Sequence, residues 1–297
     1  LRSQHKARLE AELKRLHADI TVSVWRQEAS FLPDLKDGSR KVLELHTSKF
    51  APVRMYPVGS KLKRQFGHLR VAIQERVAAR YDRFVILTHE EKPFWKGFSN
   101  LSVIPNPLSF KPQKRADASA HRVMIAGRME YVKNFSELLQ IWARVAPDFP
   151  DWQLHIYGDG WMLDALKNKA DVLGIAPQVI FEGAVSDMET AYASSSIYVM
   201  TSHFEGLPMV LIEAQSVGLP AVSYMCSSGP RDIITDGRDG FLVELYDQET
   251  FAERLRTLMR DEELRRSMGQ AAEEASHRYD LDIIMPQWLL LFNELVK

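Results

Sequence analysis

The stretch that decides the fold reads His203-Phe204-Glu205-Gly206-Leu207-Pro208-Met209-Val210-Leu211-Ile212-Glu213-Ala214. It follows an apolar strand at 197–201 and carries two glutamates on either side of a Gly-Leu-Pro turn. Pro208 suits the first position of a helix, where its missing N–H costs nothing, and Gly218 is a typical stop signal after a helix. The pattern predicts a strand, a loop holding Glu205 and a helix holding Glu213.

The start of this helix predicts an anion site. Backbone N–H groups at a helix N-terminus lack partners inside the helix and suit a phosphate group. Here they belong to Gly206, Leu207, Met209 and Val210. A carboxylate beside a phosphate repels the ligand unless it binds hydroxyl groups. The two glutamates therefore indicate a ligand with both hydroxyls and phosphate, such as a sugar nucleotide.

Further motifs lie at strand ends on both sides of this stretch. They are Gly127-Arg128-Met129-Glu130-Tyr131-Val132-Lys133-Asn134, Ile156-Tyr157-Gly158-Asp159-Gly160, Phe181-Glu182-Gly183, Gly218-Leu219-Pro220-Ala221-Val222 and Gly240-Phe241-Leu242-Val243. In this order and spacing, together with the Glu-x7-Glu pattern, they resemble the signature of retaining GT-B glycosyltransferases of family 4. The resemblance covers roughly residues 121–280.

The resemblance implies a fold and a set of roles. The fold is α/β, the GT-B architecture, with two Rossmann-like domains facing a cleft. Glu205 faces the donor sugar, Glu213 holds the nucleotide ribose, and His46 corresponds to the family's N-domain histidine at the donor sugar. The remaining residues expected at the donor nucleotide are Gly127, Gly158, Gly160, Val185, Gly206, Leu207, Pro208 and Met209.

The residues themselves support part of this picture. Arg128 and Lys133 lie at a strand-to-helix turn, where two fixed cations stabilise a leaving diphosphate without a metal. Glu213 stands among apolar neighbours, and a carboxylate in such surroundings usually has a partner. Each has a plain alternative: Arg128 and Lys133 as solvated loop residues, Glu205 as a carboxylate stabilised by the helix dipole, Glu213 as a surface residue. His46 is as well explained as an ordinary loop histidine.

Composition limits the remaining classes. A chain of 297 residues suits two domains, and its single cysteine, Cys226, fits a reducing cytosol without a disulfide framework. No apolar run is long enough to span a bilayer, and no signal peptide is visible. No histidine pair has helical ligand spacing, and no Asp-x-Asp stands where a GT-A enzyme would hold Mn²⁺. We therefore expect no metal and no cofactor other than the donor substrate.

Charge is divided unevenly along the chain. Residues 1–117 hold 23 Lys+Arg and 12 Asp+Glu, a net of +11, and the remainder holds 15 and 27, a net of −12. A basic amphipathic helix is expected at 61–81, with Leu62, Phe66, Leu69, Ile73 and Val77 on one face. The asymmetry favours an anionic membrane surface or a lipid phosphate acceptor over nucleic acid, since no nucleic-acid motif accompanies it. The alternative is that the two halves complement each other.

Alternation of strands and helices predicts parallel sheets covered on both faces. Strands are expected at 20–24, 41–46, 83–88, 101–105, 122–126, 152–157, 178–182, 197–201, 220–224 and 240–244. A linker composition at 106–120 places a domain boundary after 117. We expect an acceptor-side domain at 1–117, a nucleotide-sugar-binding domain at 118–280, and a helix at 281–297 packing toward the first. The first domain is expected to be incomplete, because the family's opening strand and glycine-rich loop do not precede Leu1.

The expected function is that of a retaining glycosyltransferase. It moves a sugar from a nucleoside-diphosphate sugar, UDP-sugar by frequency in the family, to a glycan or lipid-linked acceptor in cell-surface polysaccharide synthesis. The expected location is the cytoplasm or the inner face of the cytoplasmic membrane. Three alternatives stay open: a sugar-nucleotide epimerase or a phosphorylase-like enzyme on the same fold, and a non-catalytic nucleotide-sugar-binding module.

Overall fold

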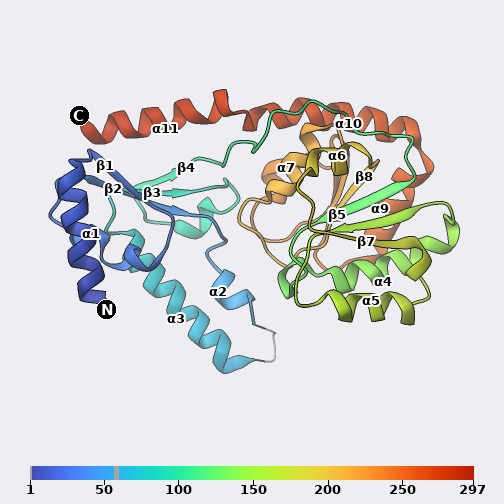
Figure 1. Ribbon diagram of the computed structural model, residues 1–297, viewed down its shortest axis with the longest axis horizontal. Helices are drawn as coiled ribbons and strands as arrows, with labels where there is room; N and C mark the ends of the chain where they lie inside the picture. Colours follow the sequence, from blue (N-terminus) through green and yellow to red (C-terminus); the bar gives the residue numbers. More distant parts are fainter. Residues whose placement is uncertain (1, 57–59) are drawn as a thin grey trace. The chain divides into compact units, whose positions relative to one another are not determined.

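The computed structural model describes residues 2–56 and 60–297, which form two compact units (Figure 1). The first unit comprises the chain up to Pro107 together with Leu281–Lys297, and the second comprises Leu108–Asp280. Each unit is a parallel sheet with helices packed against it, so the expected pair of Rossmann-like α/β domains is confirmed.

The first unit is built on four parallel strands in the order β1-β2-β3-β4. Its elements are α1 (Arg2–Leu16), β1 (Ile20–Ser23), β2 (Arg40–Leu45), α2 (Ala51–Arg54), α3 (Lys61–Ala78), β3 (Arg83–Ile86), β4 (Leu101–Val103) and α11 (Leu281–Val296), with short 3₁₀ turns at Gln27–Ser30, Leu32–Asp34 and Lys92–Trp95. Successive side chains of a strand point to opposite faces, so each face of this sheet needs its own cover.

Both faces of the first sheet are covered. Leu43 and Phe84 pack on one face with residues of α1 and α3, whereas Val42 and Val85 pack on the other face against α11. The α11 residues in that second cluster are Ile284, Leu291 and Leu295. The last helix therefore completes the core of the first unit, although the whole second unit separates the two in sequence.

The second unit has six parallel strands in the order β10-β9-β8-β5-β6-β7. Its elements are β5 (Arg122–Ala126), α4 (Phe135–Val145), β6 (Gln153–Tyr157), α5 (Leu163–Val172), β7 (Val179–Gly183), α6 (Met188–Ala193), β8 (Ile197–Met200), α7 (Met209–Ser216), β9 (Ala221–Tyr224), α8 (Pro230–Ile233), β10 (Gly240–Val243), α9 (Gln248–Arg260) and α10 (Glu262–Ser276). The strand order reverses between β5 and β8. Ligands of open parallel sheets bind beyond the carboxyl ends of the strands at such a reversal.

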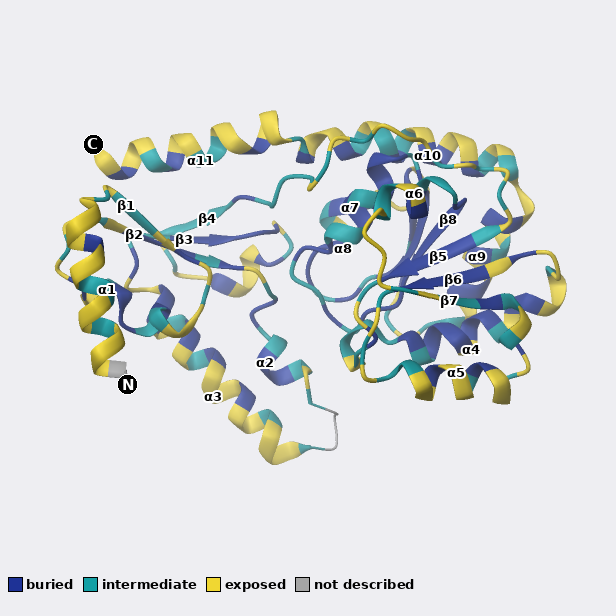
Figure 2. Cartoon of the chain, viewed as in Figure 1, coloured by how far each residue is buried: buried dark blue, intermediate teal, exposed yellow. Residues whose placement is uncertain are grey.

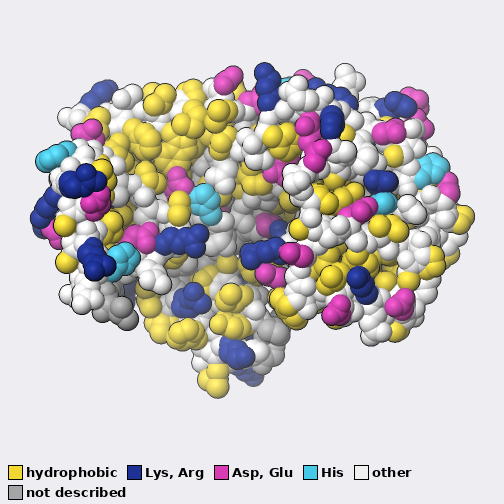
Figure 3. Space-filling model, viewed as in Figure 1, with side chains coloured by type: hydrophobic (Ala, Val, Ile, Leu, Met, Phe, Trp, Pro, Cys, Tyr) yellow, Lys and Arg dark blue, Asp and Glu magenta, His cyan; other side chains and the backbone are white. Residues whose placement is uncertain are grey.

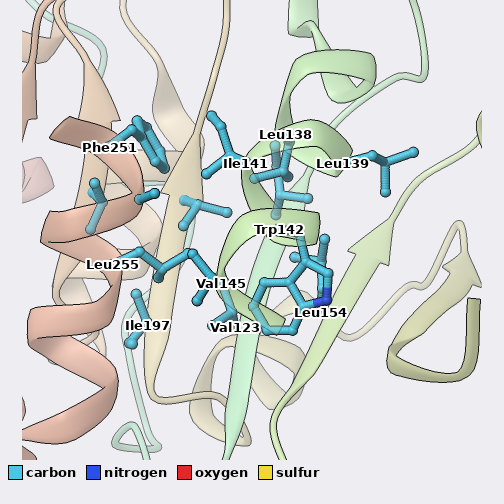
Figure 4. Close-up of a cluster of buried hydrophobic side chains, with 14 of the residues drawn as sticks. Val123, Leu138, Leu139, Ile141, Trp142, Val145, Leu154, Ile197, Phe251 and Leu255 are labelled. Atoms are coloured by element: carbon cyan, nitrogen blue, oxygen red, sulfur yellow. The ribbon is translucent and has the colours of Figure 1, made fainter. Parts of the chain in front are cut away.

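A continuous apolar core holds this second sheet. Trp142 and Val145 of α4 recur at helical spacing and lie against Val123 of β5 and Leu154 of β6, with Leu255 of α9 alongside (Figure 4). All five are fully buried or nearly so. Such a core makes the strand ends a rigid support for the loops that follow them.

The segment 108–117 belongs to the second unit, whereas the sequence analysis placed it in the first domain. Its backbone follows the second unit: Leu108 N–H donates to Tyr279 O at 2.8 Å, and Ala116 N–H donates to Val217 O at 2.8 Å. The linker composition marked a real change of structure. The segment belongs to the second unit because its backbone hydrogen bonds join it to residues a hundred or more positions away. Composition does not reveal such bonds.

Candidate functional site

Two loops meet where the strand order of the second sheet reverses. One follows β5 and ends in a 3₁₀ turn at Tyr131–Lys133, and the other follows β8. The hydroxyl of Thr201 donates to Lys133 O at 3.2 Å, and His203 N–H donates to Val132 O at 2.8 Å. These bonds bring together residues that are about 70 positions apart and fix the two loops in register.

An ion pair joins the two loops. Lys133 Nζ lies 2.7 Å from Glu205 Oε1, and both side chains are largely buried. Asn134 ends the 3₁₀ turn in the left-handed conformation (φ 53°) and leads directly into α4, which aims Lys133 back across the strand ends. Two predicted site residues are thus in direct contact, and the ion pair holds the ammonium group of Lys133 at the carboxyl ends of the strands.

Arg128 lies on the same loop but is not part of this pair. Its side chain is 78% exposed, and its nearest carboxylate is Glu130, at 3.4 Å. The guanidinium is therefore held weakly, since exposed ion pairs contribute little. It is free to turn toward an anion bound at the loop.

The loop after Glu205 leads into α7. Pro208 directly precedes the helix in an extended conformation (ψ 91°), so it caps the helix, and the expectation that it occupies the first helical position is wrong by one residue. In residues 2–56 and 60–297, no acceptor takes a hydrogen bond from the backbone N–H groups of Gly206, Leu207, Met209 and Val210. The donors predicted for an anion are thus available beside Glu205.

Glu213 lies within α7, and both of its oxygens have protein partners. Ser109 donates to Oε1 at 2.7 Å, and Tyr192 donates to Oε2 at 2.8 Å. Burial raises the pKa of Tyr192 well above its usual value, so this hydroxyl keeps its proton and donates. The sequence indicated that Glu213 needs a partner. It missed Ser109 and Tyr192, which lie on other segments and carry no motif.

The Gly-x-Gly turn has a structural role. A Cβ at Gly158 would overlap the carbonyl oxygen of Gly127, and a Cβ at Gly160 would lie 2.6 Å from Met129 O. Gly158 N–H also donates to Gly183 O at 2.7 Å, so the loops after β5, β6 and β7 pack backbone to backbone. We expected these glycines to admit the nucleotide. That role stays a prediction, and the structure adds that these glycines allow the neighbouring loops to approach closely.

Val185 and His46 lie on other segments of the chain. Val185 is exposed in the loop between β7 and α6. His46 belongs to the first unit, directly after β2, where its Nε2 lies 2.6 Å from Glu44 Oε2.

An aromatic cluster beside the ion pair was not predicted. The ring of His203 lies 4.5 Å from that of Tyr131, and its Nδ1 lies 3.2 Å from the hydroxyl of Tyr246. Burial lowers the pKa of His203, so its neutral form is favoured. The only signal for His203 in the sequence is its position two residues before Glu205.

Two features of the described residues bear on metals and membranes. No group of three His, Cys, Asp or Glu side chains in residues 2–56 and 60–297 is arranged to hold a metal ion. None of the helices in these ranges combines the length and apolar character of a bilayer-spanning segment.

Comparison with known proteins identifies the family. The model for glycosyl transferases group 1 matches residues 109–275, more than half of the chain. The chain is 37% identical over 224 residues to an exopolysaccharide phosphotransferase of Streptomyces coelicolor, covering 73% of this chain and 24% of that protein. It is 33% identical over 222 residues to the amylovoran biosynthesis glycosyltransferase AmsD of Erwinia amylovora, covering 71% of this chain and 62% of that protein.

A solved structure shares the fold. TarM of S. aureus, crystallised with UDP and other ligands, superimposes with a TM-score of 0.82 at 20% identity, covering 96% of this chain and 58% of TarM. At this identity the likeness shows the fold alone. The chain spans less than two thirds of the length of each of these relatives.

Proposed function

The chain belongs to the glycosyl transferases group 1 family, and from that premise we propose that it is a retaining glycosyltransferase of family 4. The donor is a UDP-sugar and the acceptor a glycan or a lipid-linked glycan in the synthesis of a cell-surface polysaccharide. The name of AmsD, a biosynthetic glycosyltransferase of amylovoran, supports the polysaccharide, and the UDP complex of TarM supports the donor.

One observation carries the proposal. The largely buried Lys133, the carboxylate of Glu205 and four backbone N–H groups that have no acceptor in the described chain lie together where the strand order reverses. Lys133 contacts Glu205 at 2.7 Å, and the N–H groups of the loop before α7 follow directly. The N–H groups and Lys133 suit the diphosphate, and Glu205 suits hydroxyls of the donor sugar. Glu213, oriented by Ser109 and Tyr192, has lone pairs left to accept from the ribose hydroxyls.

The proposed reaction needs charge stabilisation at the leaving group. The bond from the anomeric carbon to the diphosphate breaks, the acceptor oxygen bonds to the same face of the sugar, and the acceptor proton passes to the departing diphosphate. Lys133, which its ion pair holds in place, and Arg128, which is free to turn toward the ligand, stabilise the charge that grows on the diphosphate. We propose that these two cations make a divalent metal unnecessary, so activity should persist in EDTA.

The remaining parts of the proposal concern location and His46. The enzyme works in the cytoplasm, at the inner face of the membrane where a lipid-linked acceptor is presented. His46 contributes from the first unit to the donor-sugar side of the site.

A ligand screen followed by product analysis tests the proposal. UDP present at 100 times its Kd should stabilise the protein by about 2.7 kcal/mol, which a thermal-shift assay detects. GDP and ADP serve as controls for the base. With a UDP-sugar and an acceptor glycan, proton NMR of the product should show the anomeric configuration of the donor. Failure of every nucleoside diphosphate to raise the melting temperature would remove the donor site, and an inverted product would remove retention.

A further inference from the structure

Helix α3 shows two apolar faces, and only one of them meets the core. Leu62, Phe66, Leu69 and Ile73 are exposed, by 83% at Leu62 and 48% at Ile73, whereas Val77 is buried. The sequence analysis placed all five on one face, and Val77 continues that face at the C-terminal end of the helix, where it is buried. At 100° per residue the four exposed side chains fall within an arc of about 60°. We call these four residues the α3 stripe.

The inner face of α3 is anchored through residues that a hydrophobic pattern does not count. A Cβ at Gly67 would lie 2.5 Å from Pro52 O, so the backbone of α3 packs directly on α2. Val71, Gln74 and Ala78 are buried on this same side. Because the anchored side is already satisfied, the α3 stripe is left without a partner in the described chain, and Figure 2 shows the exposed run along the helix.

Cations border the α3 stripe. The helix carries five basic residues, Lys61, Lys63, Arg64, Arg70 and Arg76, and none of them forms an ion pair with a described residue. At 100° per residue Arg64 lies opposite the stripe, and the other four flank it. Its single acidic residue, Glu75, is matched by Lys49, whose Nζ lies 2.5 Å away. In the space-filling view, hydrophobic and Lys/Arg side chains gather together over the region of α3 (Figure 3).

We propose that α3 is the membrane-docking element of this protein: it lies in the headgroup layer of an anionic bilayer, with the α3 stripe in the acyl boundary and the flanking cations on lipid phosphates. An apolar face bordered by Lys and Arg is the pattern of helices that lie in the interface plane. This inference rests on the proposed location at the inner membrane face and names the element that produces it.

The charges favour lipid over a second copy of the chain. Two α3 helices brought together through the α3 stripe would place the four flanking cations of one helix against the four of the other, and like charges at close range repel. An anionic bilayer instead offers both a low-dielectric layer for Phe66 and Leu69 and negative charge for Lys63 and Arg70. Each basic residue near such a surface strengthens binding about fivefold, and the attraction fades within a Debye length, about 10 Å at 0.1 M salt.

Sedimentation of the full chain with vesicles tests this inference. The protein should pellet with vesicles containing anionic phospholipid at low salt, stay in solution with neutral phosphatidylcholine vesicles, and be released from the anionic ones by high salt. Phe66→Ser should weaken binding about tenfold, the effect of withdrawing one large apolar side chain from the interface. Lys63→Glu should weaken it about fivefold or more.

Matched variants on the second unit serve as controls. Val172→Ser removes a side chain that is 79% exposed, and Lys167→Glu reverses an exposed helical lysine, so neither should change vesicle binding. Equal recovery in the supernatant with anionic and neutral lipid overturns the inference. So does a Phe66→Ser variant that binds vesicles as wild type does. A dimer in lipid-free solution that Phe66→Ser dissociates would assign the α3 stripe to a second copy instead.

The two proposals fail separately. UDP binding is measured without lipid, and it involves the second unit. Loss of vesicle binding with UDP binding intact contradicts only the membrane role of α3. Vesicle binding without any response to UDP contradicts only the donor site.

Discussion

At the residue scale, the two glutamates illustrate what a motif supplies and what it leaves out. The Glu-x7-Glu spacing identified Glu205 and Glu213, and the apolar neighbours of Glu213 indicated that it needs a partner. The partners themselves were out of reach, because Tyr192 and Ser109 are brought to α7 by packing of α6 and of the segment 108–117. The local sequence pattern thus predicts the candidate site residues, whereas tertiary packing determines which side chains hydrogen-bond to them.

We expect Glu213→Ala to weaken UDP binding by roughly 1.5–3 kcal/mol, because hydrogen bonds from the ribose hydroxyls to a charged group are lost. Titration calorimetry with UDP measures this. Tyr192→Phe keeps the carboxylate and removes only one orienting bond, so it should cost less. A Glu213→Ala protein that binds UDP as tightly as wild type does would exclude the ribose role.

Lys133→Ala and Arg128→Ala should lower kcat more than they raise KM. Their charges matter most while the diphosphate leaves, so the loss falls mainly on the transition state, on the order of 10²-fold. Steady-state kinetics with saturating UDP-sugar, in buffer containing EDTA, gives both constants. Lys167→Ala, at an exposed lysine on α5, is the control and should leave turnover unchanged. Normal kcat in both loop variants would remove the loop after β5 from the mechanism.

At the element scale, the sequence predicted strands and helices well and predicted faces less well. For α3 the sequence placed the apolar residues 62, 66, 69, 73 and 77 on one face without deciding whether that face meets the core. The structure turns the first four outward, because Gly67 allows α2 to approach and Gln74 is buried beside it. The small residue Gly67 and the polar residue Gln74 thus lie on the buried side of α3. A search for periodic hydrophobic residues counts neither of them.

The glycines of the strand-end loops permit a sharp test at this scale. Gly158→Ala should destabilise the protein by about 4 kcal/mol or more, because the new Cβ meets the backbone of Gly127 in addition to the strain of a positive φ (121°). Gly174→Ala is the matched control: its φ is 71°, but nothing lies within 4 Å of the added Cβ, so only the strain of about 1–2 kcal/mol remains. Urea unfolding of both variants gives the two values. An equal loss of unfolding free energy in the two variants would mean that the loops move apart at little cost to accommodate the new Cβ at residue 158.

At the scale of the whole molecule, the chain leaves the first unit at Pro107, builds the second, and returns through α11. The sequence predicted a helix at 281–297 that packs toward the first domain. Periodicity alone does not say which sheet α11 covers, since its sequence is apolar on most sides. The structure resolves this through one cluster, in which Leu291 and Leu295 pack with Val42 and Val85.

The first unit therefore depends on a helix that is distant in sequence, and adjacent leucines of α11 test that dependence. Leu291 is 5% exposed within the core cluster, whereas Leu290 is 65% exposed. Leu291→Ala should cost about 2–5 kcal/mol, the usual range for a buried leucine, and Leu290→Ala should stay within about 0.5 kcal/mol of wild type. Calorimetry should show the loss in the unfolding of the first unit, while the UDP affinity of the second unit stays unchanged, because every residue proposed for the donor site except His46 lies in Leu108–Asp280. Equal melting of the two variants would show that α11 is not needed for the core of the first sheet. A loss of UDP affinity in Leu291→Ala would show instead that the two units depend on each other for stability.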